Sequence, residues 1–367
     1  MSQPPKDLES RQSIEASSLS KSQVAQAGGD VHQTYQEIHH HHHGDSRFRG
    51  EEVQSVREGV EKILLQQVRG EIDARLATSL HSATFINLDK EKQSSQVERS
   101  WDAEVKVGQQ KSIALEKNTK IIDVFDQTNI SGKLLILGAP GAGKTTTLLE
   151  LAEELAKRAD VQNTNPIPVL LNLSSWKPNK SLDQWLVSEL KSKYGVRRKI
   201  TQGFLDGYQL VPLLDGLDEV DTQWHEDCIH AINQFYEKYR PANIVVCCRR
   251  HDYEATQTKL QLNGAVYLNA LDKEQIQAYL LSAEHPEIWN SLEADVALME
   301  MAQSPLLLSV LTLARQAISF KQWRGLESNE EKRNYLVSAY VGRMLTRPMS
   351  HGFYAAGKEP TSQQTIK

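Results

Sequence analysis

The chain has 367 residues, of which 39% are hydrophobic and 24% charged, and its formal net charge is −5. This composition suits one large domain or two to three ordinary ones, and it excludes a surface that is basic throughout. Nucleic acid is therefore not indicated as a partner. The three cysteines are Cys228, Cys247 and Cys248, and they lack the spacing of a metal site or a disulfide framework, which favours a reducing compartment.

The N-terminus carries charged residues and lacks the apolar segment of a secretory signal. The chain also lacks any run of roughly 18 apolar residues, the length that a membrane span requires. We therefore expect a cytoplasmic protein without a membrane partner.

The first 130 residues divide into two parts. Residues 1–45 are rich in Ser, Gln, Gly and His, which predicts a disordered leader. The five histidines from His39 to His43 are interpreted as a solvated tract, with metal binding as a minor alternative.

Residues 46–130 are predicted to form a helical N-terminal and linker region. One apolar stripe at helical spacing supports this, made of Val53, Val56, Val60, Ile63, Leu64, Val68, Ile72 and Leu76.

Residues 131–270 alternate between short apolar runs and amphipathic stretches. Strands that are separated by helical crossovers predict an α/β fold with a doubly wound, mostly parallel, five-stranded sheet. The predicted strands are 133–137, 169–173, 210–214, 244–248 and 265–268, with helices over 144–159, 182–194 and 225–239.

Only helical patterns follow the last predicted strand. They predict a helical subdomain over 271–345, and 346–367 is a tail or the start of a further region. The predicted helices are 272–283, 292–301, 305–318 and 330–345.

The strongest motif is the sequence GAPGAGKT, which follows a predicted strand and opens a predicted helix. It matches the phosphate-binding P-loop, in which glycines let backbone N–H groups converge on phosphate oxygens at a helix N-terminus. Its lysine would contact the β- and γ-phosphates, and its threonine hydroxyl would bind Mg²⁺. The candidate nucleotide-binding residues are Gly138, Ala139, Pro140, Gly141, Ala142, Gly143, Lys144, Thr145 and Thr146, with Thr145 also a candidate Mg²⁺ ligand.

A second motif, LLDGLDE, ends the predicted strand 210–214. In a Walker B element, a carboxylate that follows an apolar strand reaches the ligands around Mg²⁺. Asp215 is therefore the second candidate metal ligand. Asp218 and Glu219 are candidates for polarising an attacking water, and Glu219 is the preferred base.

A third motif places Arg249 and Arg250 at the carboxyl end of a strand, the edge where ligands bind in open α/β sheets. A guanidinium suits a γ-phosphate, so Arg249 is a candidate catalytic residue. Cys247 and Cys248 in the same strand are interpreted as core residues.

These three motifs, in this order, resemble the NACHT family of STAND-class P-loop NTPases, in a form common in bacteria and especially cyanobacteria. The resemblance covers about 133–345. It implies a five-stranded parallel sheet in which the Walker B and sensor strands lie beside the P-loop strand. It also implies that Pro305 of the helical subdomain lies near the base of the nucleotide, and that Arg249 is the sensor arginine. Cys247 and Cys248 stand where the family has Thr and Ser.

The resemblance further implies a winged helix and a sensor region after the helical subdomain, and we expect this chain to lack both. The predicted function is an ATP-binding switch with bound ATP or ADP and Mg²⁺, which hydrolyses ATP slowly in bacterial defence or stress signalling. An unknown protein effector and nucleotide-dependent self-association are the expected partnerships. The alternatives are an AAA+-like motor ATPase acting on protein or DNA, and a nucleotide-binding interaction module with little turnover.

Overall fold

The computed structural model describes residues 46–78, 103–107, 113–114, 119–240 and 242–346. The predicted leader, its histidine run and the predicted C-terminal tail from residue 347 onward lie outside these residues.

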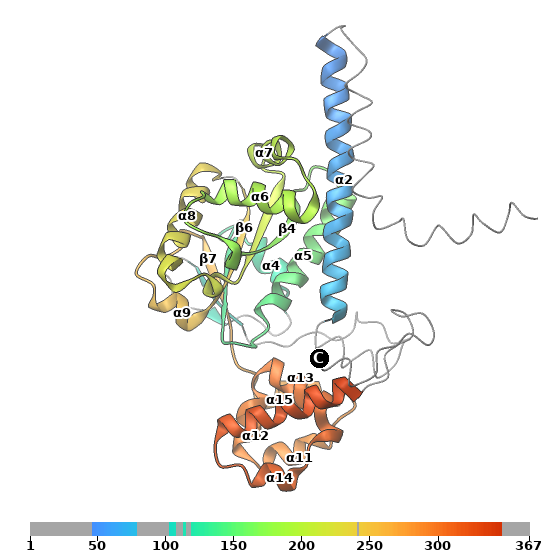
Figure 1. Cartoon of the computed structure of the whole chain (residues 1–367), viewed down its shortest axis with the longest axis vertical. Coiled ribbons are helices and arrows are strands. Elements are labelled where there is room, and N and C mark those ends of the chain that lie inside the picture. Colours follow the sequence, from blue (N-terminus) through green and yellow to red (C-terminus); the bar gives the residue numbers. More distant parts are fainter. Residues whose placement is uncertain (1–45, 79–102, 108–112, 115–118, 241, 347–367) are drawn as a thin grey trace, which may run out of the picture.

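Five parallel strands form the centre of the molecule (Figure 1). In four of them the side chains are buried almost without interruption, as expected for a parallel sheet that is covered on both faces. The predicted α/β fold is confirmed. The strands are β3 (Lys133–Gly138), β4 (Ile167–Asn172), β5 (Leu210–Asp215), β6 (Ile244–Arg249) and β7 (Gly264–Leu268), in the order β7-β3-β6-β5-β4.

The strand order corrects one detail that the resemblance implied. The sensor strand β6 pairs directly with the P-loop strand β3, but the Walker B strand β5 does not, because β6 lies between them. The chain leaves β3 for the far edge at β4 and returns inward through β5, and β6 then fills the gap. The carboxyl ends of all these strands still meet at one edge.

Two further strands extend the sheet beyond β7. Strand β1 (Ala103–Val107) pairs antiparallel with β7, and β2 (Ile113–Ala114) pairs antiparallel with β1. The interpretation of residues 46–130 as helix and linker was wrong for these segments. The sequence AEVKV alternates in the manner of a strand, and a strand at this position covers the ladder edge that β7 would otherwise expose.

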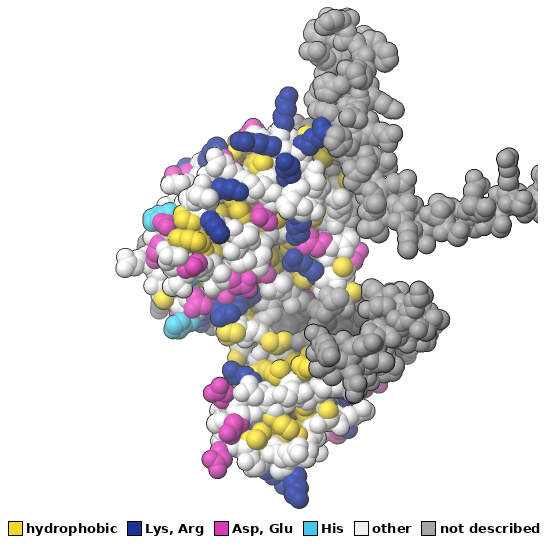
Figure 2. Space-filling view, viewed as in Figure 1, with side chains coloured by type: hydrophobic (Ala, Val, Ile, Leu, Met, Phe, Trp, Pro, Cys, Tyr) yellow, Lys and Arg dark blue, Asp and Glu magenta, His cyan; other side chains and the backbone are white. Residues whose placement is uncertain are grey.

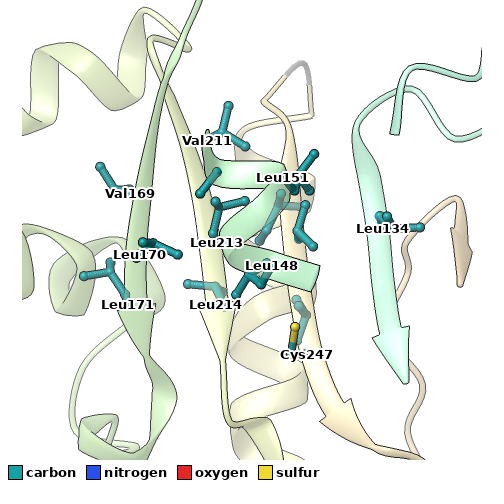
Figure 3. Packing of buried hydrophobic residues seen from close by; sticks show 14 of the residues in the cluster. Leu134, Leu148, Leu151, Val169, Leu170, Leu171, Val211, Leu213, Leu214 and Cys247 are labelled. Atoms are coloured by element: carbon teal, nitrogen blue, oxygen red, sulfur yellow. The ribbon is translucent and has the colours of Figure 1, made fainter. Parts of the chain in front are cut away.

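Helices cover the sheet on both sides. The helix after the P-loop packs its apolar face on the strands, with Leu148 and Leu151 among the buried contacts shown in Figure 3. This face repeats every three to four residues, which explains why the helix was predictable from sequence. The helices of this part are α4 (Ile121–Phe125), α5 (Lys144–Val161), α6 (Leu182–Tyr194), α7 (Arg198–Asp206), α8 (His225–Lys238) and α9 (Arg250–Ala255).

The long helix α2 (Ser46–Thr78) lies against α5 and β4, and its N-terminal part projects beyond the sheet domain (Figure 1). Leu64, Val68 and Ile72 are buried in this contact. Ile63 of the predicted stripe is instead 38% exposed, because it points to the side of the contact face.

The C-terminal helices form a second apolar cluster, the helical region. The predicted helix 292–301 is two helices, because the Asp295 side chain accepts a hydrogen bond from the Leu298 amide and starts a new one. The helices are α10 (Lys273–Ser282), α11 (Ile288–Glu293), α12 (Val296–Ala302), α13 (Pro305–Ala314), α14 (Phe320–Arg324) and α15 (Asn329–Thr346).

Among the described residues, no single helix has the length and apolar composition of a membrane span. Helix α12 and the segment 305–317 meet both criteria only when counted together, and they are bent by 114° at the break.

Candidate nucleotide site

The P-loop connects β3 to α5 through two glycines in left-handed conformations. Gly141 has φ 75° and Gly143, the N-cap of α5, has φ 93°. Side chains with a Cβ rarely adopt such angles, so the motif's glycines are needed for the turn itself. The turn leads directly into the N-terminus of an 18-residue helix, where free backbone N–H groups favour an anion.

Lys144 lies across this loop. Its Nζ donates hydrogen bonds to the carbonyl oxygens of Gly138 and Ala139, each at 3.1 Å. The ammonium group is therefore held over the turn that the glycines form, and its contact to phosphate oxygens stays a prediction.

Thr145 and Asp215 come together although 70 positions separate them in sequence. The Thr145 hydroxyl donates to Oδ2 of Asp215 at 2.8 Å. Burial raises the pKa of Asp215, and the nearby Glu219 carboxylate raises it further, while the Thr145 hydrogen bond opposes the rise. A hydroxyl and a carboxylate side by side are hard oxygen ligands of the type that Mg²⁺ prefers, so this donor set fits the predicted cation.

Glu219 is folded back toward β4. Gly216, with φ 73°, makes room for it, since a Cβ at that position would lie 2.8 Å from Oε2 of Glu219. The Asn172 side-chain amide donates to the same Oε2 at 2.9 Å.

Asn172 was missed by sequence reasoning. It is the last residue of β4 and is paired in register with Asp215 at the same edge of the sheet. Its Oδ1 also accepts a hydrogen bond from the Ser174 amide at 2.7 Å, which fixes the amide's orientation. A polar residue that ends an apolar run was the available signal.

Asp218 anchors Arg249. Its Oδ1 accepts from the Arg249 backbone amide at 2.9 Å and its Oδ2 lies 2.7 Å from Nε of the same arginine. The Asp218 side chain is 6% exposed and that of Arg249 is 48% exposed. Because both carboxylate oxygens are engaged by Arg249, we assign Asp218 the task of holding that arginine at the sheet edge.

Arg250 has a different environment. It lies over the ring of Tyr267, 4.8 Å from its centroid, and its Nε bonds Glu254 at 2.9 Å. Cys247 and Cys248 are fully buried in β6, and burial raises the pKa of both thiols, that of Cys248 to about 12. Both stay protonated and act as packing residues, in line with the sequence-based interpretation.

The helical region reaches the P-loop at Pro305, the first residue of α13. The next backbone amide, that of Leu306, donates to the Gly141 carbonyl oxygen at 3.2 Å. A Cβ on Gly141 would lie 2.9 Å from both the Leu306 Cβ and the Ser304 Oγ. Pro305 therefore lies beside the P-loop. Its proximity to the base of a bound nucleotide stays a prediction.

The comparisons agree with this geometry. Residues 133–287, from β3 to the start of the helical region, match the family model of the NACHT domain. This chain carries a NACHT domain. Its sheet domain is accordingly that of a nucleotide-binding P-loop NTPase. A search of curated proteins gives no match.

Several solved structures share part of the fold. The ORC1 protein of Aeropyrum pernix, in complex with DNA, is 14% identical with a TM-score of 0.33, over 59% of this chain and 63% of that one. Drosophila ORC bound to DNA is 16% identical, with a TM-score of 0.37 and 62% coverage of each chain. A Walker-type ATPase of Pyrococcus abyssi is 13% identical, with a TM-score of 0.35, over 63% and 76%. The chain spans less than two thirds of the length of the first two of these structures.

Proposed function

We propose that this protein binds ATP with Mg²⁺ at the P-loop and hydrolyses it slowly, as a signalling switch. The contact between Thr145 and Asp215 carries the proposal, because it places a hydroxyl and a carboxylate beside the helix N-terminus that would hold the phosphates. Among the residues that the structure describes, no three His, Cys, Asp or Glu side chains form a metal site of their own. A cation held only by these two groups, phosphate and water fits that finding.

The Mg²⁺ ion, when bound, would neutralise charge on the phosphates. Lys144 would exchange its two carbonyl contacts for phosphate oxygens, which are stronger acceptors for an ammonium group. Thr145 and Asp215 would supply the two protein ligands of the ion.

Glu219 is the proposed base, which would take a proton from the attacking water at Oε1 or Oε2. Asn172 is proposed to position it through the 2.9 Å hydrogen bond. Arg249 is proposed to stabilise negative charge on the terminal phosphate, since Asp218 fixes its Nε while nearly half of its side chain stays exposed.

The proposal that the protein acts as a switch rests on the contact between α13 and the P-loop. The α13 N-terminus lies within 3.2 Å of Gly141, so a change in the loop on nucleotide binding or hydrolysis would shift the helical region. An effector protein, nucleotide-dependent self-association, a cytoplasmic setting and a role in bacterial defence or stress signalling complete the proposal through the family resemblance.

The test is calorimetric titration with ATP and Mg²⁺, combined with steady-state phosphate release. Lys144→Ala is expected to raise the Kd for ATP by about 100-fold, the equivalent of about 2.7 kcal/mol, with unchanged circular dichroism. Glu219→Gln is expected to keep ATP binding and to lower kcat by about 100-fold or more.

Unchanged ATP affinity in Lys144→Ala would refute the nucleotide site. Rapid turnover by the unmodified protein, stimulated by added DNA or unfolded protein, would favour the motor alternative. Tight binding with no turnover, unaffected by Glu219→Gln, would favour a binding module.

A further inference from the structure

Lys193, on the last turn of α6, joins three elements of the sheet domain. Its Nζ donates to the backbone carbonyl oxygen of Leu170 in β4 and contacts Oε1 of Glu71 in α2 at 2.7 Å. Leu170 lies two residues before Asn172, the residue that holds Glu219. The ammonium group thus connects the long N-terminal helix to the strand that ends at the catalytic edge.

The Glu71 carboxylate is fully engaged on the α2 side. Its Oε2 accepts a hydrogen bond from the Tyr194 hydroxyl at 2.6 Å, and its Oε1 is shared by Lys193 and by Arg75 at 2.9 Å. The Glu71 side chain is 16% exposed, and Tyr194 is 7% exposed. A carboxylate this buried needs such partners, because an unpaired one would be strongly unfavourable.

Burial also acts on the lysine. It lowers the pKa of Lys193, and the hydrogen bond and charge of Glu71 oppose that change. Breaking either contact of Nζ would leave a partly buried ammonium group without its partner, so the three elements are expected to shift together.

Helix α6 holds the end of β4 at a second point. The Ser175 hydroxyl, three residues after Asn172, lies 3.1 Å from Oε1 of Glu189, and the Trp185 indole N–H donates to it at 3.0 Å. Both partners belong to α6, and Trp185 is 2% exposed. Asn172 therefore lies between two attachments of the chain to one helix, at Leu170 in β4 and at Ser175 just after the strand.

We propose that Lys193 is a remote positioning residue for the hydrolysis proposed above: it fixes β4 so that Asn172 holds Glu219, and α2 acts on the reaction through it. This inference rests on the proposed function. A chain of contacts leads from Glu71 on α2 through Lys193 to Leu170. Two residues further along β4 it reaches the side-chain amide of Asn172. A displacement of about 1 Å at a catalytic group is enough to lower a rate severalfold or more.

The experiment measures kcat and KM for ATP in the full-length protein, below the thermal transition of each variant. Lys193→Met is expected to lower kcat about tenfold with KM changed less than twofold, because the phosphate-binding loop is untouched. Asn172→Ala is expected to lower kcat similarly, and the double variant is expected to fall no further, since both act on Glu219 by one route. Lys193→Arg keeps a donor and is expected to restore most of kcat.

Arg69→Ala is the matched control. Arg69 lies on α2, as Glu71 does, and pairs with Asp160 of α5 at 2.6 Å, but both side chains are about half exposed. Its removal is expected to leave kcat unchanged. If Lys193→Met does not fold, Lys193→Gln, which retains a shorter donor, is measured with the same expectations.

A lower melting temperature with unchanged kcat in Lys193→Met would overturn the inference, as would additive losses in the double variant. Glu219→Gln is measured alongside. If Glu219→Gln turns over normally, Glu219 is not the base and the proposed mechanism of hydrolysis fails. If it is inactive while Lys193→Met keeps full kcat, only the inference about Lys193 fails.

Discussion

The sheet domain and the helical region use polar side chains in different ways. In the sheet domain, polar residues at the ends of separate strands converge at one edge: Asn172 of β4, Asp215 of β5 and Arg249 of β6. In the helical region, several of the polar contacts close helix ends. The Asp272 carboxylate accepts from the Gln275 amide at 2.6 Å, and Asp295 accepts from both the Leu298 amide and the Trp323 indole.

This difference assigns separate tasks to the two parts. The carboxyl ends of parallel strands lie at one edge of the sheet, whatever the length of chain between the strands. Side chains from distant parts of the sequence can therefore form one site there. Helix caps satisfy local backbone groups and leave nothing pointed at a ligand. Figure 2 shows hydrophobic side chains on the side of the helical region that faces the sheet domain. Among the described residues, the helical region contacts the site through the backbone of α13, at Gly141. We expect the sheet domain to perform the chemistry and the helical region to respond to it.

The largest effect is expected from removing core side chains in each part. Leu148→Ala in α5 and Leu292→Ala in the helical cluster should each lower the free energy of unfolding by about 2–5 kcal/mol, because both side chains are fully buried. Only Leu148→Ala should also raise the Kd for ATP, by about fivefold, since it lies one helical turn from Lys144. Urea unfolding and calorimetry would measure both. An equal loss of affinity in Leu292→Ala would contradict the division of tasks.

The contact between the two parts is tested at Gly141. Gly141→Ala should lower the free energy of unfolding without nucleotide by about 2–4 kcal/mol, from its left-handed φ and from contact with Ser304 and Leu306. Gly195→Ala is the control, because Gly195 has φ 69° with no atom near its Cβ position, so about 1 kcal/mol of backbone strain is expected. If urea unfolding shows equal losses of unfolding free energy in the two variants, the contact between α13 and the P-loop does not contribute to the effect.

A smaller effect is expected at the anchor of Arg249. Asp218→Asn keeps an acceptor for the Arg249 amide but removes the charge beside Nε, so the guanidinium should lose its fixed position. We expect kcat to fall about tenfold with the Kd for ATP changed less than threefold, measured by phosphate release and calorimetry. A loss as large as that of Glu219→Gln would show that Asp218 is the base and would exchange the two roles.

The smallest effect concerns the charge of Asp215. Burial raises its pKa in the folded state, so its contribution to stability is present at low pH and is lost as the pH rises through that folded-state value. Asp215→Asn should therefore raise the midpoint of urea unfolding at neutral pH, while abolishing the effect of Mg²⁺ on ATP affinity. The gain should shrink as the pH falls through the folded-state pKa of Asp215, because the wild-type carboxyl is then protonated as well. A lower midpoint at neutral pH would contradict the direction of the shift.

Much of the sheet domain could be predicted from sequence because the signals are local. The strands from β3 to β6 begin and end within about two residues of their predicted bounds, since a buried parallel strand reads as an unbroken apolar run. The P-loop needs glycines at its left-handed positions, and the acidic residue at the end of β5 marks a candidate metal ligand by its place in the sequence. The stripe of α2 likewise shows that this helix has a partner.

The sequence by itself therefore determined the α/β fold, the P-loop, the pairing of Thr145 with Asp215 and the existence of a helical region. Only the tertiary structure decided the place of β6 between β3 and β5, the bond from Asn172 to Glu219 and the anchoring of Arg249 by Asp218. The same holds for the buried contacts of Glu71 on α2. Periodicity records which face of an element is buried, over a few residues. Which elements become neighbours is decided by contacts between distant segments, and no local pattern encodes their order or the polar pairs that form between them.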